Sequence, residues 1–146
     1  MKVEIILDES LDDTLVKIYT LSYSKDIESI QKSLETINKN VLVGFKDDEV
    51  YILDYKDIVR FYAEDKRVYI ESLGGKFISR LRLYEIEERV DKNSFLKISR
   101  YEIINIAYVK RLDLSFKGTI AVELKNGEVS YVSRRYLKEF KRILGF

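Results

Sequence analysis

The chain lacks three residue types on which many functional sites depend: its 146 residues include no cysteine, no histidine and no proline. Without cysteine there is no disulfide, no thiolate zinc site and no cysteine nucleophile. Without histidine the commonest general base near neutral pH and the commonest transition-metal ligand are both missing. We therefore expect a protein that is not an enzyme and that uses no cofactor or metal.

Long apolar runs are also missing. None approaches the 18 residues of a membrane span, and the N-terminal MKVEIILDES has acids where a signal peptide needs an apolar core. Glycine is scarce, with 6 residues, whereas 46% of the chain is apolar and there are 11 tyrosines and 7 phenylalanines. This composition predicts a folded, soluble, cytoplasmic protein of one domain, with or without a short extension.

The net charge of +1 conceals an uneven distribution. Residues 91–146 carry 12 basic and 6 acidic side chains, a net charge of +6, whereas residues 1–40 carry 5 and 8, a net charge of −3. A basic C-terminal third on a near-neutral chain is typical of a face that binds a polyanion such as a nucleic acid. A solvated positive surface is the alternative interpretation.

The first 40 residues have the pattern of a β-β-α extension. Apolar and polar residues alternate over 2–7 and 14–20, as in two strands joined by the acidic stretch Asp8–Asp13. Ser24 can then cap a helix that ends at Asn38–Asn40. The apolar face of this helix consists of Ile27, Ile30, Leu34 and Ile37.

From Val41 onward the pattern is mostly β. Alternating runs predict strands over 41–45, 49–54, 57–65, 67–73, 76–81, 95–99, 102–113, 119–124 and 128–133. Gly74-Gly75 and Asn126-Gly127 each lie between two such runs and are strong hairpin signals, because two-residue loops favour residues that adopt positive φ. No strand–helix–strand alternation is present, so we expect antiparallel sheets rather than a parallel one.

Two short helices complete this part of the chain. Leu83, Ile86 and Val90 mark a helix through an acidic segment, and Ser133 can cap a closing helix that ends just before Gly145. The inward face of the closing helix is predicted to be Leu137, Phe140 and Leu144. The expected fold class is therefore mostly β (α+β). No helix pair has the polarity of a helix-turn-helix, and a zinc finger is excluded by the missing ligands.

The start of the closing helix is the first candidate binding site. With Ser133 as N-cap, Arg134 and Arg135 occupy the first turn, where a positive charge is unfavourable by about 0.3–1 kcal/mol at the positive end of the helix dipole. An approaching phosphate would reverse this sign, since it meets free backbone amides and two guanidinium groups together. Pairing of the arginines with an acid such as Glu139 is the structural alternative.

Two further candidates lie at strand ends. In the strand over 95–99, Leu96 and Ile98 point inward and Lys97 and Ser99 outward, which leaves Arg100 at the end, free to project into a groove. Arginine there is the side chain that reads guanine with two hydrogen bonds. Lys66-Arg67 forms a turn, for which a local ion pair with Glu64-Asp65 is the simpler explanation.

These residues resemble the LytTR family of DNA-binding domains. The run Phe95–Arg100, continuing to Ile103–Ile106 and Val109, is similar to the central signature of that family. Asn126-Gly127 and Val132–Lys138 are similar to its C-terminal signature. The resemblance extends upstream through Asp57–Val59, Phe61, Lys66-Arg67 and the acidic helix, and covers roughly residues 48–146 in the family's order and spacing.

The resemblance implies a LytTR-like domain whose loops, rather than a recognition helix, enter successive major grooves of double-stranded DNA. Carried over by position, the base-reading residues are Lys66, Arg67, Ser99, Arg100 and Arg135. We assign Arg134 and Lys138 to phosphates, because the same helix start presents them beside Arg135. Asn105 matches a family position, and we interpret it as structural, bonding nearby backbone in a turn. Two positions depart from the family pattern: Ser99 stands where histidine is frequent, and Tyr101 stands where serine is expected.

We therefore predict a DNA-binding domain over residues 41–146, preceded by an extension over residues 1–40. The resemblance to short, stand-alone LytTR transcriptional regulators implies a homodimer on DNA. It leaves dimerisation or binding of a regulatory membrane protein as the role of the extension, with no small-molecule substrate. Two alternatives stay open: a protein-interaction module using exposed strand edges and tyrosine-rich loops, and a distant one, a hydrolase with two carboxyl groups of different pKa in a deep pocket.

Overall fold

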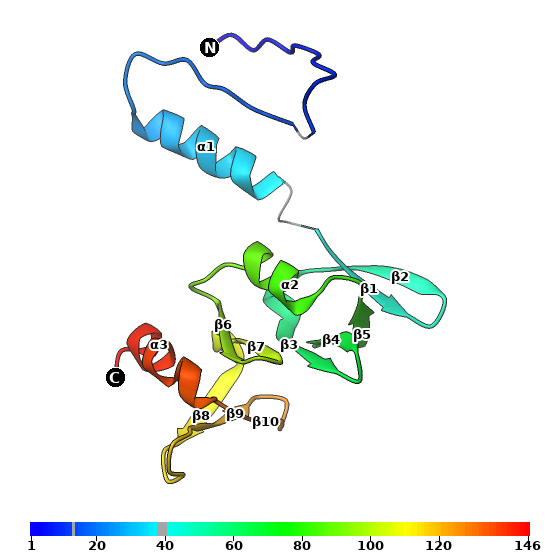
Figure 1. Cartoon of the computed structure of the whole chain (residues 1–146), viewed down its shortest axis with the longest axis vertical. Coiled ribbons are helices and arrows are strands. Elements are labelled where there is room, and N and C mark those ends of the chain that lie inside the picture. The colour runs from blue at the N-terminus through cyan, green and yellow to red at the C-terminus, as the bar shows by residue number, and fades with distance from the viewer. Residues whose placement is uncertain (13, 38–40) are drawn as a thin grey trace. The chain divides into compact units, whose positions relative to one another are not determined.

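The structure is a computed structural model that describes residues 1–12, 14–37 and 41–146, without the side chains of residues 36 and 37. The chain divides into two compact units, Met1–Leu34 and Glu35–Phe146 (Figure 1). The division falls earlier in the chain than the predicted boundary between residues 40 and 41. No helix of the described residues is long and apolar enough to cross a membrane.

The N-terminal unit contains a helix but none of the expected strands. Helix α1 (Lys25–Ile37) begins as predicted, with the Ser24 hydroxyl accepting a hydrogen bond from the Ile27 amide at 3.4 Å. The strands predicted over 2–7 and 14–20 are wrong, because both segments lack ladder hydrogen bonds. An alternating pattern makes a strand only where a partner surface can bury its apolar side, and so short a unit offers none. Asp13 and the predicted helix end at Asn38–Asn40 lie outside the described residues.

The second unit is sheet-rich, as the sequence predicts. Its elements are β1 (Leu42–Lys46), β2 (Glu49–Leu53), η1 (Tyr55–Asp57), β3 (Ile58–Glu64), β4 (Arg67–Ser72), β5 (Gly75–Ser79), α2 (Leu83–Arg89), β6 (Phe95–Ser99), β7 (Glu102–Asn105), η2 (Ile106–Tyr108), β8 (Val109–Asp113), β9 (Ala121–Leu124), β10 (Val129–Tyr131) and α3 (Arg134–Leu144). Every strand pair recorded in the described residues is antiparallel. The predicted mostly-β fold is confirmed.

The strands form two sheets. The larger has seven strands in the order β2-β1-β5-β4-β3-β7-β6, and the smaller has three in the order β10-β9-β8. The single strand predicted over 102–113 is wrong, since the chain leaves the larger sheet after β7 and enters the smaller one at β8. Asn105 causes the break: its side-chain oxygen accepts a hydrogen bond from the Ala107 amide at 3.0 Å and caps η2 between the two strands.

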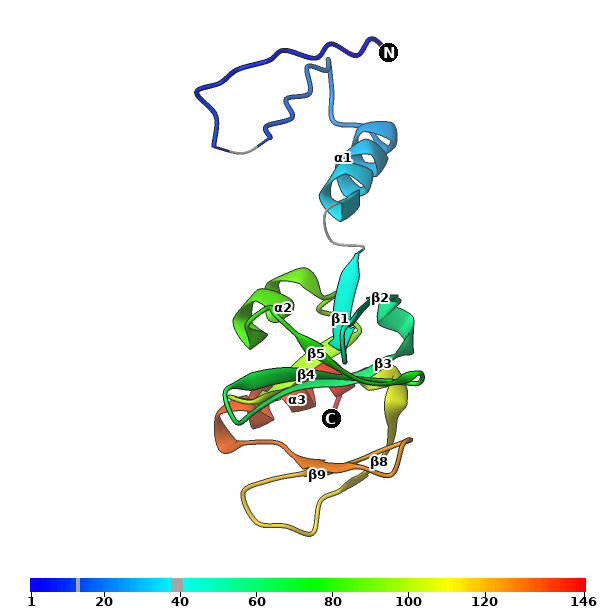
Figure 2. The ribbon, with the colours of Figure 1, turned by 90° about the vertical axis from the view of Figure 1, so that its right-hand side faces the viewer.

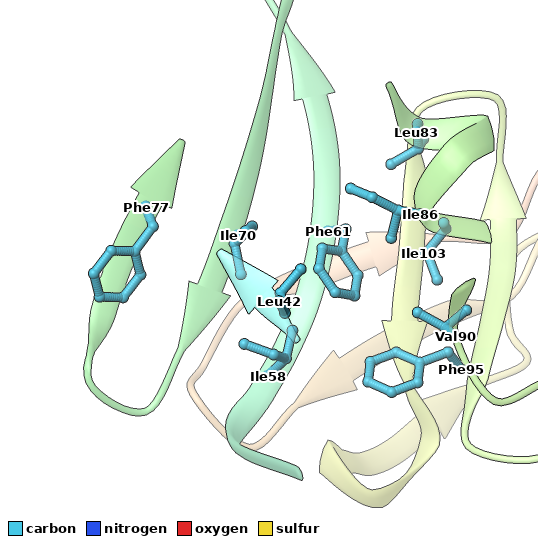
Figure 3. Close-up of a cluster of buried hydrophobic side chains, with 10 residues drawn as sticks. All are labelled: Leu42, Ile58, Phe61, Ile70, Phe77, Leu83, Ile86, Val90, Phe95 and Ile103. Atoms are coloured by element: carbon cyan, nitrogen blue, oxygen red, sulfur yellow. The ribbon is translucent and has the colours of Figure 1, made fainter. Parts of the chain in front are cut away.

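The seven-stranded sheet separates two apolar cores. One face packs against α2, and its cluster of buried side chains consists of Leu42, Ile58, Phe61, Ile70, Phe77, Leu83, Ile86, Val90, Phe95 and Ile103 (Figure 3). The opposite face packs against α3 and the three-stranded sheet through Val59, Leu96, Ile98, Ile104, Ile120, Val122, Leu124, Val132 and Phe140. Figure 2 shows α2 on one side of β3, β4 and β5, and α3 with β8 and β9 on the other.

The predicted hairpins and closing helix are present, with local differences. The β4–β5 register pairs Ser72 with Gly75, so the two-residue loop is Leu73-Gly74 rather than Gly74-Gly75. In the β9–β10 turn the Gly127 amide donates to the Leu124 carbonyl at 3.0 Å and Gly127 takes a φ of 90°. Helix α3 buries Phe140, and it ends at Gly145, whose φ of 84° is the left-handed conformation that terminates helices.

Candidate nucleic-acid interface

The β3–β4 turn carries two exposed cations, Lys66 and Arg67. Asp65 and Lys66 have φ values of 50° and 63°, the left-handed pair of a type I′ turn, which joins twisted strands with only two residues. Neither Lys66 nor Arg67 has an acidic partner within ion-pair distance among the described residues. The local ion pair with Glu64 or Asp65 is therefore not formed, and both cations are available to a ligand.

The β6–β7 turn places Arg100 at the same end of the sheet. Ser99 is half-buried and its hydroxyl accepts a hydrogen bond from the Tyr101 amide at 3.2 Å, whereas Arg100 is exposed. The Tyr101 carbonyl in turn accepts a hydrogen bond from the Ala63 amide at 2.8 Å, near the end of β3. This bond fixes the β6–β7 turn beside the β3–β4 turn, so the first two predicted contact sites are neighbours.

The start of α3 is fastened to the same region. Ser133 is the N-cap in an extended conformation, and its amide donates to the Ile98 carbonyl at 2.8 Å, one residue before Ser99. The Ser133 side chain makes no capping hydrogen bond, and the first turn contains no acid. The amides of this helix start are thus without the side-chain acceptor that usually satisfies one of them.

Three cations in the first half of α3 are free of acidic partners in the part of the chain that the structure describes. Arg134, Arg135 and Lys138 are exposed, and none forms an ion pair among the residues that the structure describes. Glu139, the predicted alternative partner, binds Arg142 instead, which donates to it from Nε at 2.9 Å. The sequence-based alternative of an ion pair with Glu139 is therefore wrong for Arg134 and Arg135.

Gly118, in the β8–β9 loop, leaves room for Arg134. The Arg134 Nε lies 3.1 Å from the point where a Cβ on residue 118 would stand, and the φ of Gly118 is 73°. A larger residue would push the guanidinium aside and would strain the backbone. The β8–β9 loop, whose Lys117 is also exposed, therefore lies against the start of α3.

Some cations elsewhere on the surface are paired with acids. Lys97, predicted to face solvent, is largely covered and pairs with Glu87 on α2 at 3.0 Å. Lys32 pairs with Glu28 at 3.0 Å, and Arg111 pairs with Glu123 across β8 and β9. The described cations of the β3–β4 turn, the β6–β7 turn and the start of α3 form no ion pairs, so their positive potential is not neutralised locally.

The sequence analysis did not identify Arg80, a cation beside the β3–β4 turn. The β4–β5 register pairs Val68 with Ser79, and one step further sets Arg67 opposite Arg80. Arg80 is exposed, with its guanidinium carbon 4.1 Å from the centroid of the Phe45 ring. The signal was present in the sequence, because the glycines of the β4–β5 hairpin fix this register once the loop is placed correctly.

Asn105 has the structural role that the sequence predicts. Besides capping η2, its side-chain amide donates to the Ile58 carbonyl at 2.8 Å, and the residue is 4% exposed. It therefore ties the end of β7 to the start of β3. We assign it no contact with a ligand.

A cluster of charged and polar side chains joins the two sheets, and we call it the Arg60 cluster. Its members are Arg60, Glu71, Glu102, Asn126, Glu128 and Ser130. Arg60 on β3 donates to Glu71 on β4 from Nε at 2.8 Å and from Nη2 at 2.9 Å, a bidentate pair. Its Nη1 donates to Glu102 on β7 at 3.3 Å. One guanidinium thus holds two nearly buried carboxylates.

The carboxyl groups of this cluster have shifted pKa values. Burial raises the pKa of Glu71, but hydrogen bonds and charge from Arg60 outweigh it, so the pKa lies below its usual range. Burial also raises the pKa of Glu102, and there Ser130 and Arg60 offset only part of the effect. One oxygen of Glu102 is buried without a hydrogen-bond partner among the described residues, in keeping with the raised pKa.

Two shallow grooves bear on the hydrolase alternative. One, of about 120 Å³, lies on the three-stranded sheet beside Phe116 and Tyr131. The other, of about 320 Å³, lies between β6 and α3. Neither is lined by Glu71 or Glu102, so the carboxyl pair with separated pKa values faces Arg60 rather than a substrate-sized space.

Comparisons with known proteins agree with this geometry. The profile of the LytTr DNA-binding domain matches residues 48–145. A solved LytTr DNA-binding domain from Bacillus cereus superposes with a TM-score of 0.70 at 25% identity, over 73% of this chain and 98% of that one. Two proteins from Staphylococcus aureus, strains NCTC 8325 / PS 47 and COL, are each 32% identical over 145 residues, 99% of this chain and 98% of their own.

The Staphylococcus aureus relatives are each named an uncharacterized HTH-type transcriptional regulator. The described residues of this chain contain α1, α2 and α3, and strands separate each helix from the next, so they hold no helix-turn-helix pair. The matching profile describes a DNA-binding domain and not an enzyme. With two thirds of its length matched by that profile and its fold shared with a solved member, the chain belongs to the LytTR family of DNA-binding domains.

Proposed function

We propose that this protein is a transcription regulator that recognises a specific double-stranded DNA site through loop side chains placed in successive major grooves. One observation carries the proposal. The β3–β4 turn, the β6–β7 turn and the start of α3 are joined by two backbone hydrogen bonds, and each presents cations without acidic partners. A group of unpaired cations on rigid neighbouring elements is the electrostatic footprint of a DNA-binding surface.

The side chains divide into two roles. Lys66-Arg67 and Ser99-Arg100 project from tight turns, and together with Arg135 they are proposed to reach base edges, where arginine discriminates guanine by two hydrogen bonds. Arg134 and Lys138 are proposed to bind phosphates beside the free amides of the α3 start, which position the domain without reading sequence. The names of the Staphylococcus aureus relatives support the regulatory role.

We assign dimerisation or partner binding to residues 1–40. Large apolar side chains of this segment are exposed, among them Val3 (76%), Ile5 (86%), Leu7 (91%), Val16 (55%) and Ile18 (41%). Side chains of this size are costly to leave in water, and together they form an exposed apolar surface. Such a face needs a partner, and a second copy of the chain is the occupant we favour for a protein that acts on repeated half-sites. A regulatory membrane protein is the alternative.

The acidic balance of residues 1–40 argues against DNA as their ligand. Their net charge of −3 would repel phosphates, whereas residues 91–146, at +6, would attract them. We therefore propose a division between a DNA-reading unit and an associating extension, in a protein that acts in the cytoplasm on chromosomal DNA.

A protein-interaction module remains the second candidate, favoured by edge strand β2. Its Val50 and Ile52 are 61% and 80% exposed, and one side of its backbone is unpaired. Exposed apolar edges of this kind pair with other chains. Ionic strength separates the two functions, because apolar contacts depend weakly on salt.

The test is a selection of genomic fragments with the purified full-length protein, followed by titration of the recovered site at several salt concentrations. With Arg134 and Lys138 as the phosphate contacts of one domain, the affinity of each domain should fall by about tenfold between 50 and 200 mM salt. Recovery of no preferred sequence, or an affinity indifferent to salt, would contradict DNA recognition and favour the protein-interaction function.

A further inference from the structure

The Arg60 cluster lies where the seven-stranded sheet meets the β9–β10 hairpin. Three of its members belong to the larger sheet: Arg60, Glu71 and Glu102. The bidentate bond to Glu71 and the bond to Glu102 hold the guanidinium in one plane, with its central carbon 4.5 Å from the centroid of the Tyr62 ring. A planar fork held on several sides has a defined direction, so it can orient whatever else it binds.

The remaining members come from the hairpin. Arg60 Nη1 donates to the Ser130 hydroxyl at 3.3 Å, and Arg60 Nη2 lies 3.5 Å from a carboxylate oxygen of Glu128. From the turn, the Asn126 side-chain amide donates to Glu71 at 3.1 Å. Apolar side chains of the two sheets also pack together, and such packing is less directional than hydrogen bonds. The polar contacts therefore fix the hairpin on the larger sheet.

The position of the hairpin is passed on to α3. Three residues separate Ser130 from Arg134, the first residue of the helix. Within them the Val132 amide donates to the Ile120 carbonyl at 2.9 Å and the Ser133 amide to the Ile98 carbonyl at 2.8 Å. The start of α3 is thus attached both to β10, through this short link, and to β6 of the larger sheet, through the Ser133 bond. A shift of β10 over the larger sheet would pull on the Ser133–Ile98 bond and disturb the start of α3.

We propose that Arg60 is a positioning residue for DNA recognition: it holds the β9–β10 hairpin, and with it the start of α3, in register with the turns of the seven-stranded sheet. The inference rests on the proposed function, since it explains how Arg100 and Arg135 are kept at the spacing that successive contacts on DNA require. Arg60 itself touches no DNA, because its side chain is only 12% exposed within the cluster.

The composition of the cluster favours orientation over stability. Two nearly buried carboxylates and a third, half-exposed one surround a single guanidinium. Replacing buried ion pairs by apolar residues commonly leaves a fold as stable or more so, whereas in some proteins a buried polar network selects one arrangement over others. A lysine could supply the charge at position 60 but not the fork that reaches both sheets.

The first test measures the coupling without DNA. The chain has no cysteine, so Glu88→Cys on α2 and Lys141→Cys on α3 accept spin labels at two defined, exposed points. Asn126→Asp with Ser130→Ala removes two of the three hairpin contacts and leaves the Arg60–Glu71 and Arg60–Glu128 pairs in place. The distance distribution between the labels should broaden or shift. The matched control is Glu123→Gln, which breaks an ion pair inside the smaller sheet and should leave the distribution unchanged.

The second test measures base preference on the selected DNA site. The same double variant should bind about tenfold more weakly, through lost preference at the base pair assigned to Arg135 and with the pair assigned to Arg100 still recognised. An unchanged distance distribution, or an equal loss at all base pairs, would overturn the inference. If the unmodified protein selects no DNA at all, the proposed function fails, and the label distances still decide whether the cluster holds the hairpin.

Discussion

Replacement of Arg134 by glutamate reverses a charge at the first residue of α3. In the structure this side chain is exposed, forms no ion pair among the described residues and lies beside Gly118. The helix start has no acid in its first turn and no capping hydrogen bond from Ser133. The Arg134→Glu variant therefore loses no attractive partner, and its new carboxylate meets the positive end of the helix dipole and uncapped amides.

The magnitude follows from these two changes of sign. Removing an unfavourable charge and adding a favourable one are each worth about 0.3–1 kcal/mol at an exposed helix end, so the free energy of unfolding should rise by about 0.6–2 kcal/mol. Affinity for DNA should move in the opposite direction. A hydrogen bond between charged groups contributes about 1.5–3 kcal/mol, and a carboxylate beside phosphate adds repulsion, so binding should weaken by about a hundredfold or more.

Urea unfolding and DNA titration of the same preparations test both halves of this reasoning. Lys141→Glu, a reversal in the last turn of α3, is the control for stability: there the dipole has the opposite sign, so the variant should lose stability. A less stable Arg134→Glu protein would show that Arg134 holds the β8–β9 loop in place. Unchanged DNA affinity would remove it from the interface.

Three further outcomes are expected. Arg100→Ala and Arg135→Ala should each weaken DNA binding by about 1–3 kcal/mol and relax preference at one base pair; normal binding at native stability would exclude the residue concerned. A protein lacking residues 1–40 should bind one half-site normally, with folding checked by circular dichroism, and should lose cooperative binding to two; equal cooperativity would exclude dimerisation through this segment. Because the folded-state pKa of Glu102 is raised, ionisation of Glu102 destabilises the fold at neutral pH, and the free energy of unfolding should rise as the pH falls through that pKa toward the unfolded value. In urea unfolding followed from pH 7 to pH 4, Glu102→Gln should flatten this rise, whereas Glu123→Gln should not. Parallel profiles for the wild type and Glu102→Gln would contradict the assignment.

Local signals in the sequence were sufficient to predict the backbone setting of the residues that we propose as DNA contacts. Arg134 and Arg135 follow a capping serine, Arg100 follows a short alternating strand, and Lys66 occupies a turn between two strands. Each inference needs only a few neighbouring residues, because turns and helix starts are determined by local backbone preferences. The structure confirms each of these local settings.

The relation between those settings could not be predicted from sequence. The bonds from Ala63 to Tyr101 and from Ser133 to Ile98 join residues distant in the chain, and no local pattern encodes them. The Arg60 cluster is hidden for the same reason. In an alternating strand Arg60 has the pattern of an exposed polar residue, and only the packing of a second sheet brings hairpin side chains to it.

The prediction of two N-terminal strands was wrong because their alternation is also only a local signal. Residues 2–7 have the alternation of a strand, and the structure leaves their apolar side chains exposed. A strand is stabilised by its neighbours on a sheet and by what covers it, neither of which the alternation itself supplies. An alternating pattern therefore shows only that a segment could form a strand if a neighbouring strand were present.

The backbone of the β3–β4 turn points to a compromise between folding and binding. Asp65 and Lys66 both occupy the left-handed region, where side chains other than glycine are held at an energetic disadvantage of about 1 kcal/mol or more. The β9–β10 turn has a single left-handed residue, Gly127, and so avoids that disadvantage. A mutation of Lys66 to glycine would relieve the backbone strain of the turn. The presence of a lysine at this position is therefore what we expect if its ammonium group serves binding at a cost in stability. Engineering for thermal tolerance would favour glycine at this position, and the more stable protein would lose an ammonium group that is proposed to contact DNA.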